Sequence, residues 1–146
     1  MHETSEIYAV TLSPVTYPTL CDAALDYPLT VADIARLRLD NAQLAYLSAC
    51  DTTVTSADHA DEATHLAAAF QLAGYRHVVG TLWPVIDFAA TRIARRVYQH
   101  LTGNGTTPPD PRLAAQALHR AIRAARDQDP AKPRLWGGHR RHYCST

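Results

Sequence analysis

One stretch of the chain, residues 43–83, limits the possible folds more than any other. Residues 43–49 are mostly apolar and typical of a buried strand, and residues 62–72 carry apolar side chains at helical spacing. Residues 77–83 are mainly apolar or β-branched up to Pro84. A strand, a helix and a strand within this length make a βαβ unit, whose two strands lie parallel. The pattern therefore predicts an α/β fold with a mainly parallel sheet.

Further elements flank this unit. Residues 7–12 favour a short strand, residues 31–37 favour a short helix, and the polar residues 52–60 favour a loop. Two amphipathic helices follow, one with Asp87 as its N-cap and one over residues 110–128. We expect both helices to cover faces of the sheet.

Size, charge and cysteine content narrow the class of protein. The 146 residues fit a single domain, and the 14 basic residues balance the 14 acidic ones, which gives no sign of a nucleic-acid or anionic-membrane partner. Cys21, Cys50 and Cys144 have no paired spacing, so a reducing cytoplasm is expected rather than a disulfide framework. No segment has the pattern of a signal peptide or of a membrane span.

A thiol stands where the first strand of the βαβ unit ends. Ligands of open α/β folds bind outside the carboxyl ends of the strands, so Cys50 is a candidate nucleophile. A small buried apolar residue is the alternative role for a free cysteine. Asp51, Trp83 and Asp87 also stand at strand ends and are candidates for a substrate pocket, although a helix N-cap explains Asp87 equally well.

Several segments of the sequence, in order, resemble the CHAT domain, a caspase-like cysteine peptidase domain often found behind tetratricopeptide repeats in bacteria. They are residues 29–37, the Leu-Ser-Ala-Cys box within residues 44–52, residues 61–75, and the Gly-Thr-Leu-Trp-Pro-Val run within residues 78–85. The resemblance implies a caspase-like, three-layer α/β/α sandwich, incomplete here, and a cysteine–histidine dyad whose cysteine is Cys50. It predicts three parts: a divergent N-terminal segment, a CHAT-like core and a basic tail, over residues 1–24, 25–136 and 137–146.

The chain departs from the family pattern near both ends. The family histidine lies in a His-Gly pair that ends an earlier strand, but residues 8–14 contain neither histidine nor glycine, and the first strands of the sheet are missing. Residues 137–142 replace an apolar strand of the family. We therefore expect a partial or inactive peptidase domain that acts as an interaction or signalling module on protein or peptide partners. An exposed sheet edge would favour self-association.

Other histidines leave an alternative open. His2 is the only upstream histidine, and His59 follows Cys50 within the predicted loop, so either could serve an active cysteine endopeptidase with a non-family base. His65 is expected to face solvent. His77 begins the second strand and should therefore lie at the sheet end opposite Cys50.

The tail is basic and glycine-containing, with no strand or helix period. His139, His142 and Cys144 have a spacing that could hold a metal, but three ligands on such a tail fit a disordered segment better, so no metal site is expected. A third possibility is a small-molecule binder at the sheet edge, but no glycine-rich phosphate-binding loop supports it. The chemistry of a cysteine peptidase implies no metal or organic cofactor.

Overall fold

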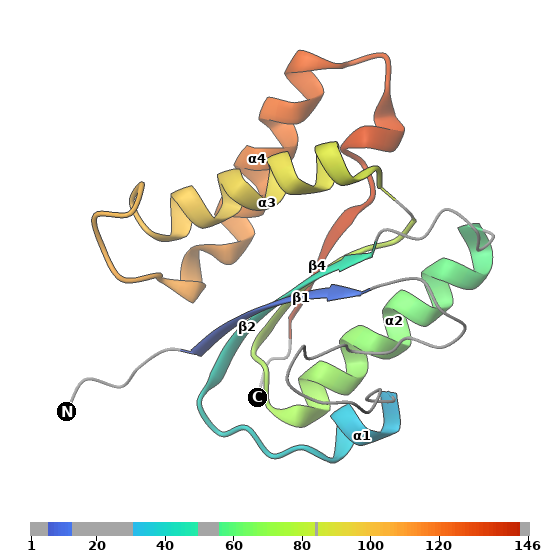
Figure 1. The fold of residues 1–146 in the computed structure, drawn as a ribbon, viewed down its shortest axis with the longest axis vertical. Helices are drawn as coiled ribbons and strands as arrows, with labels where there is room; N and C mark the ends of the chain where they lie inside the picture. The colour runs from blue at the N-terminus through green and yellow to red at the C-terminus, as the bar shows by residue number, and fades with distance from the viewer. Residues whose placement is uncertain (1–5, 13–30, 50–55, 84, 144–146) are drawn as a thin grey trace.

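The computed structural model describes residues 6–12, 31–49, 56–83 and 85–143. Figure 1 shows the elements in chain order: β1 (Glu6–Leu12), α1 (Val31–Arg36), β2 (Ala42–Ala49), α2 (Ser56–Ala73), β3 (His77–Thr81), α3 (Asp87–Leu101), α4 (Ala114–Gln128) and β4 (His139–Tyr143). Single 3-10 turns precede α4 and β4, at Pro111–Leu113 and Pro133–Leu135.

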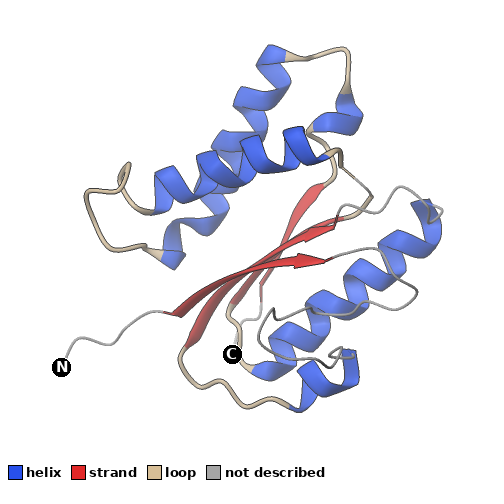
Figure 2. Ribbon diagram, viewed as in Figure 1, coloured by secondary structure: helices blue, strands red, loops and turns tan. Residues whose placement is uncertain are grey.

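A single sheet with the strand order β1-β2-β3-β4 forms the middle of the structure (Figure 2). β1 pairs with β2 and β2 pairs with β3 in parallel, whereas β4 runs antiparallel to β3. The α/β fold and the mainly parallel sheet predicted from the sequence are confirmed. Each parallel crossover carries helical chain, α1 between β1 and β2 and α2 between β2 and β3.

Helices cover both faces of the sheet (Figure 1). Alternation along β2 sends Ala45 and Leu47 into a core with α1 and α2, and Leu44 and Tyr46 into a second core with α3 and α4. α2, α3 and α4 bury most of the apolar stripes that their sequences predict, while Ala94, Tyr98 and Ile122 are only partly buried. On α4 the buried residues are Ala114, Ala117, Leu118, Ala121 and Ala125.

Two helix starts differ from the sequence expectation. α2 begins at Ser56, inside the predicted loop, because residues 56–61 contain neither glycine nor proline and acidic residues suit the positive end of a helix. α3 has Ile86 as its N-cap, with no side-chain cap hydrogen bond, so Asp87 is the first helical residue rather than the cap. Asp110 does cap its turn as predicted, accepting a hydrogen bond from the Arg112 amide at 3.0 Å.

The tail was predicted to have no regular structure, and this prediction is wrong. His139–Tyr143 form β4, which pairs with all five residues of β3. The two glycines before it let Trp83 approach, since a Cβ atom on Gly138 would lie 2.9 Å from the indole ring. The Leu82 amide donates to the Gly138 carbonyl at 2.8 Å, which continues the pairing beyond the strand. The partner strand thus makes a strand from a basic segment that shows no apolar period.

None of the helices in the described part of the chain combines the length and the apolar character needed to cross a bilayer.

Gly74 fixes the connection between α2 and the α1–β2 segment. Its φ of +120° is a conformation that L side chains rarely adopt, and a Cβ atom there would collide with the Leu39 carbonyl oxygen. The Leu39 amide donates to the Ala73 carbonyl at 2.8 Å, and the Tyr75 amide donates to the Phe70 carbonyl at 3.1 Å, which closes the end of α2. The close approach of two backbones therefore depends on glycine.

We expect Gly74→Ala to lower the free energy of unfolding by roughly 2–3 kcal/mol, because backbone strain and a collision act together. Urea denaturation followed by circular dichroism measures the loss. Gly80→Ala is the matched control, since a Cβ atom there meets no described atom within 4 Å. Equal losses of unfolding free energy in Gly74→Ala and Gly80→Ala would contradict the conclusion that the close approach of the two backbones depends on glycine.

Candidate functional site

The carboxyl edge of the parallel strands is the candidate site. β2 lies between β1 and β3 and ends at Ala49, the residue directly before Cys50, while β1 ends beside it at Leu12. Cys50, Asp51 and the alternative base His2 lie outside the described residues. The strand that carries the candidate nucleophile is therefore an interior strand of the sheet with parallel neighbours on both sides, as the sequence predicts.

Two helices begin on the same edge. α2 follows β2 after residues 50–55, and α3 follows β3 after a short connection, so both run back across the sheet from this edge (Figure 1). Helix N-termini carry partial positive charge and stabilise a nearby thiolate. His59 stands within the first two turns of α2, and Asp87 is the first residue of α3, although the side chains of both lie outside the description.

Trp83 joins the end of β3 to the C-terminal segment. Its indole N–H donates to the Arg134 carbonyl at 3.2 Å, and its ring lies against Gly138. It also packs, together with Leu135, on a small apolar cluster at the start of α3 that contains Val85. Trp83 therefore has a packing role in this structure, and its role in a substrate pocket stays a prediction.

Two further histidines lie where the sequence places them. His77 pairs with Leu44 near the start of β2, at the sheet end away from Ala49, and Arg141 lies 3.1 Å from its Nδ1 atom. His65 is exposed on α2. Neither side chain stands at the carboxyl edge.

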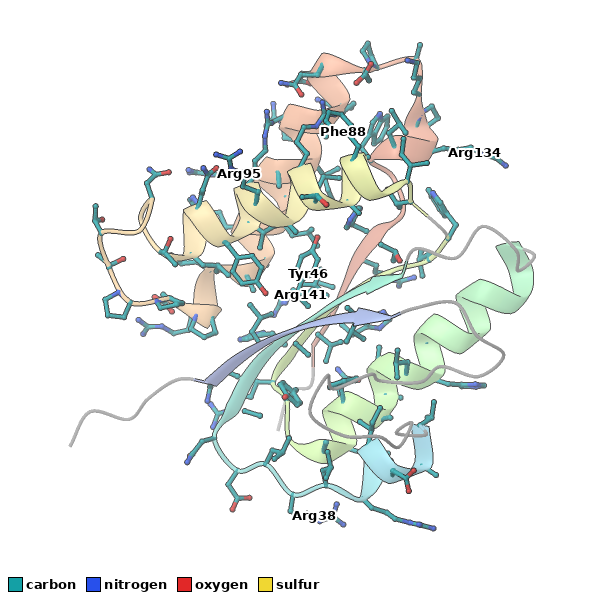
Figure 3. All side chains as sticks on the ribbon, viewed as in Figure 1. Arg38, Tyr46, Phe88, Arg95, Arg134 and Arg141 are labelled. Atoms are coloured by element: carbon teal, nitrogen blue, oxygen red, sulfur yellow. The ribbon has the colours of Figure 1, made fainter. Side chains whose placement is uncertain are left out.

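His139 is a buried histidine at the carboxyl edge that sequence reasoning did not choose as a base. It pairs with Thr81, the last residue of β3. It shares its sheet face with Arg141, which rises with Tyr46 from the sheet toward α3 (Figure 3). The imidazole is only 7% exposed, and neither ring nitrogen has a hydrogen-bond partner among the described residues. Burial lowers the pKa of His139 to about 4, which keeps the ring neutral at pH 7.

The strand also separates the two histidines of the tail. His142 pairs with Val78, whose side chain packs under α1 and α2, so it lies on the face opposite His139. Cys144 lies outside the described residues, and the described part of the chain contains no group of three metal-ligating side chains. The spacing that suggested a metal site therefore does not bring its histidines together.

Acid should destabilise the fold through His139. The unfolded histidine takes up a proton near pH 6.5 while the buried one resists until about pH 4, so the free energy of unfolding falls across this window by up to about 3 kcal/mol. We expect His139→Leu to reduce the pH dependence measured by urea denaturation, with a smaller slope remaining because burial also lowers the pKa values of His77 and His142. The exposed His119→Gln should leave it unchanged. A slope as steep in His139→Leu as in the wild type would contradict this origin.

Comparison with known families gives a clear result. The family described as the CHAT domain matches residues 9–144, which include both β1 and β4. A search of curated proteins finds no matching relative. The match extends well past the 25–136 segment expected from the motifs and takes in almost the whole chain. On this match, the chain belongs to the CHAT domain family, a group of caspase-like, peptidase-related domains.

Proposed function

We propose that this chain is a CHAT-type domain with a caspase-like sandwich and with Cys50 in the nucleophile position, and that it acts as an interaction or signalling module without peptidase activity of its own. The observation that carries the proposal is the state of His139. Among the histidines whose side chains are described, it alone pairs with the last residue of a parallel strand, and it is buried and neutral.

The energetics of proton transfer support an inactive site. A free cysteine has a pKa near 8.5, and burial holds the pKa of His139 at about 4. Moving the proton from the thiol to this imidazole would cost about 6 kcal/mol before any ion-pair stabilisation. An efficient general base has a pKa near the working pH, so His139 is poorly matched to the task.

Exposed apolar side chains at the start of α3 support a binding role. Ile86 is 54% exposed and Phe88 is 70% exposed, on either side of the first residue of α3 (Figure 3). The Arg92 guanidinium lies 5.3 Å from the centre of the Phe88 ring and holds it in place. Exposed apolar groups beside a rigid helix start suit a protein or peptide partner. Three cysteines without paired spacing and the bacterial setting of the resemblance support a bacterial cytoplasmic location.

The alternative function is an active cysteine endopeptidase with a non-family base. It is favoured by α2, which starts at the carboxyl edge and carries His59 in its first two turns. In that case the Cys50 thiolate would attack a peptide carbonyl, the amine would leave with a proton from the imidazolium, and water would hydrolyse the acyl-enzyme.

Labelling with a peptide that carries a thiol-reactive warhead separates the two functions. We expect Cys50 to react no faster than the cysteine of a short free peptide, because no base activates it. His59→Ala should not change the rate, and His65→Ala, an exposed position on the same helix, is its control. Rapid labelling that disappears in Cys50→Ala would overturn the proposal in favour of the peptidase, and its loss in His59→Ala or in His2→Ala would identify the base.

Self-association through the sheet edge is a further part of the proposal. β1 ends the sheet, and no strand among the described residues pairs with its outer edge. Unpaired backbone groups on such an edge can pair with a second copy of the chain. We expect light scattering to detect species larger than a monomer as the protein concentration rises, and a monodisperse monomer throughout would contradict this.

A further inference from the structure

A polar hollow of about 290 Å³ opens between the C-terminal half of α3 and α4. Its position is remote in sequence from Cys50, and its lining includes Ala121, a small residue that is only 2% exposed. The residues that line it are Arg96, Gln99, His100, Gly103, Asn104, Arg120 and Ala121.

The hollow has an excess of positive charge. Two guanidinium groups, one imidazole and two side-chain amides surround it, and no carboxylate does. Two arginines elsewhere on this helical pair do have acidic partners: Arg92 pairs with Asp129, and Arg126 pairs with Asp127. Neither Arg96 nor Arg120 takes part in an ion pair within the described part of the chain.

Side chains rather than backbone groups are the donors that face the hollow. The backbone N–H of Asn104 donates to the Gln99 carbonyl at 2.7 Å, so it caps α3 and is not available to a ligand. His100 Nε2 lies 3.3 Å from the Gln116 side-chain oxygen, a contact that ties α3 to α4 beside the hollow. The guanidinium groups of Arg96 and Arg120 are therefore the permanently charged donors that a ligand would meet, beside the side-chain amides of Gln99 and Asn104.

We infer that this hollow binds a compact oxyanion of the phosphate type, held between Arg96 and Arg120. Planar guanidinium groups form paired hydrogen bonds with phosphate oxygens, and an anion between them relieves the repulsion of two like charges. The lining contains no benzene or indole ring on which a nucleobase could stack, and the volume is at the small end for ligand pockets. The ligand is thus a phosphate group with little attached, rather than a nucleotide recognised through its base.

Isothermal titration calorimetry with inorganic phosphate at low ionic strength tests the site. We expect saturable binding of one phosphate per chain, weakened roughly tenfold by Arg96→Gln and by Arg120→Gln, and abolished in the double variant. Arg95→Gln is the matched control, because Arg95 is exposed on the same helix and does not line the hollow (Figure 3). The affinity of the Arg95→Gln variant for phosphate should stay within about twofold of the wild type, because this substitution removes the same charge but no contact with the ligand.

Two outcomes would overturn the inference. One is the absence of saturation by about 20 mM phosphate at low salt, where screening is weak. The other is an equal loss of affinity in Arg95→Gln, which would mean that overall charge attracts the ion. Unfolding curves of the variants should match the wild type, which separates lost binding from lost folding.

The same titration distinguishes the sources of the phosphate. Tighter binding of a short phosphoserine peptide than of inorganic phosphate, with no binding of the unphosphorylated peptide, would support a phosphate carried on a protein. Equal affinities would support a free or small-molecule phosphate. Cys50→Ala should change neither result, so this inference stands or fails separately from the proposed function.

Discussion

The parallel pairing of β2 with β3 is the interaction on which the rest of the structure depends. Both strands are buried on both faces: Ala45 and Val78 pack under α1 and α2, while Leu44 and Val79 pack under α3 and α4. A strand in this position needs apolar residues at successive positions rather than at alternate ones. Because both strands are apolar on both faces, the sheet needs a helical layer and a core on each side. The same parallel pairing defines the carboxyl edge, where Cys50 follows β2 in the sequence.

The C-terminal segment completes the sheet through packing rather than through its own strand propensity. β4 contains histidines and arginines, yet it pairs along the whole of β3. Its entry depends on Trp83, which lies against Gly137 and Gly138 and donates a hydrogen bond to the Arg134 carbonyl. A residue considered for a substrate pocket thus helps to hold the last strand on the sheet, and the family match accordingly runs to residue 144.

Chemistry at the carboxyl edge follows from two opposing electrostatic influences. The N-termini of α2 and α3 favour an anion there, as a cysteine nucleophile requires. Burial without a polar partner acts on His139 in the other direction, because it disfavours the charged imidazolium that a thiolate would need beside it. Among the described side chains, His139 is the imidazole at this edge and is a poor proton acceptor, which supports the proposed binding role.

The sequence alone was enough to predict the α/β class, the order of the elements from β1 to α4, most of the apolar stripes of α2, α3 and α4, and the end of β2 just before Cys50. These features come from local periodicity, which a single segment contains in full. It was not enough to predict β4, the burial of His139 or the hollow between Arg96 and Arg120. Each of these depends on residues that are far apart in the chain, namely Trp83 with Gly138, Thr81 with His139, and α3 with α4. Only tertiary structure decided them, because a basic segment with no apolar period becomes a strand only when a neighbouring strand supplies its hydrogen bonds.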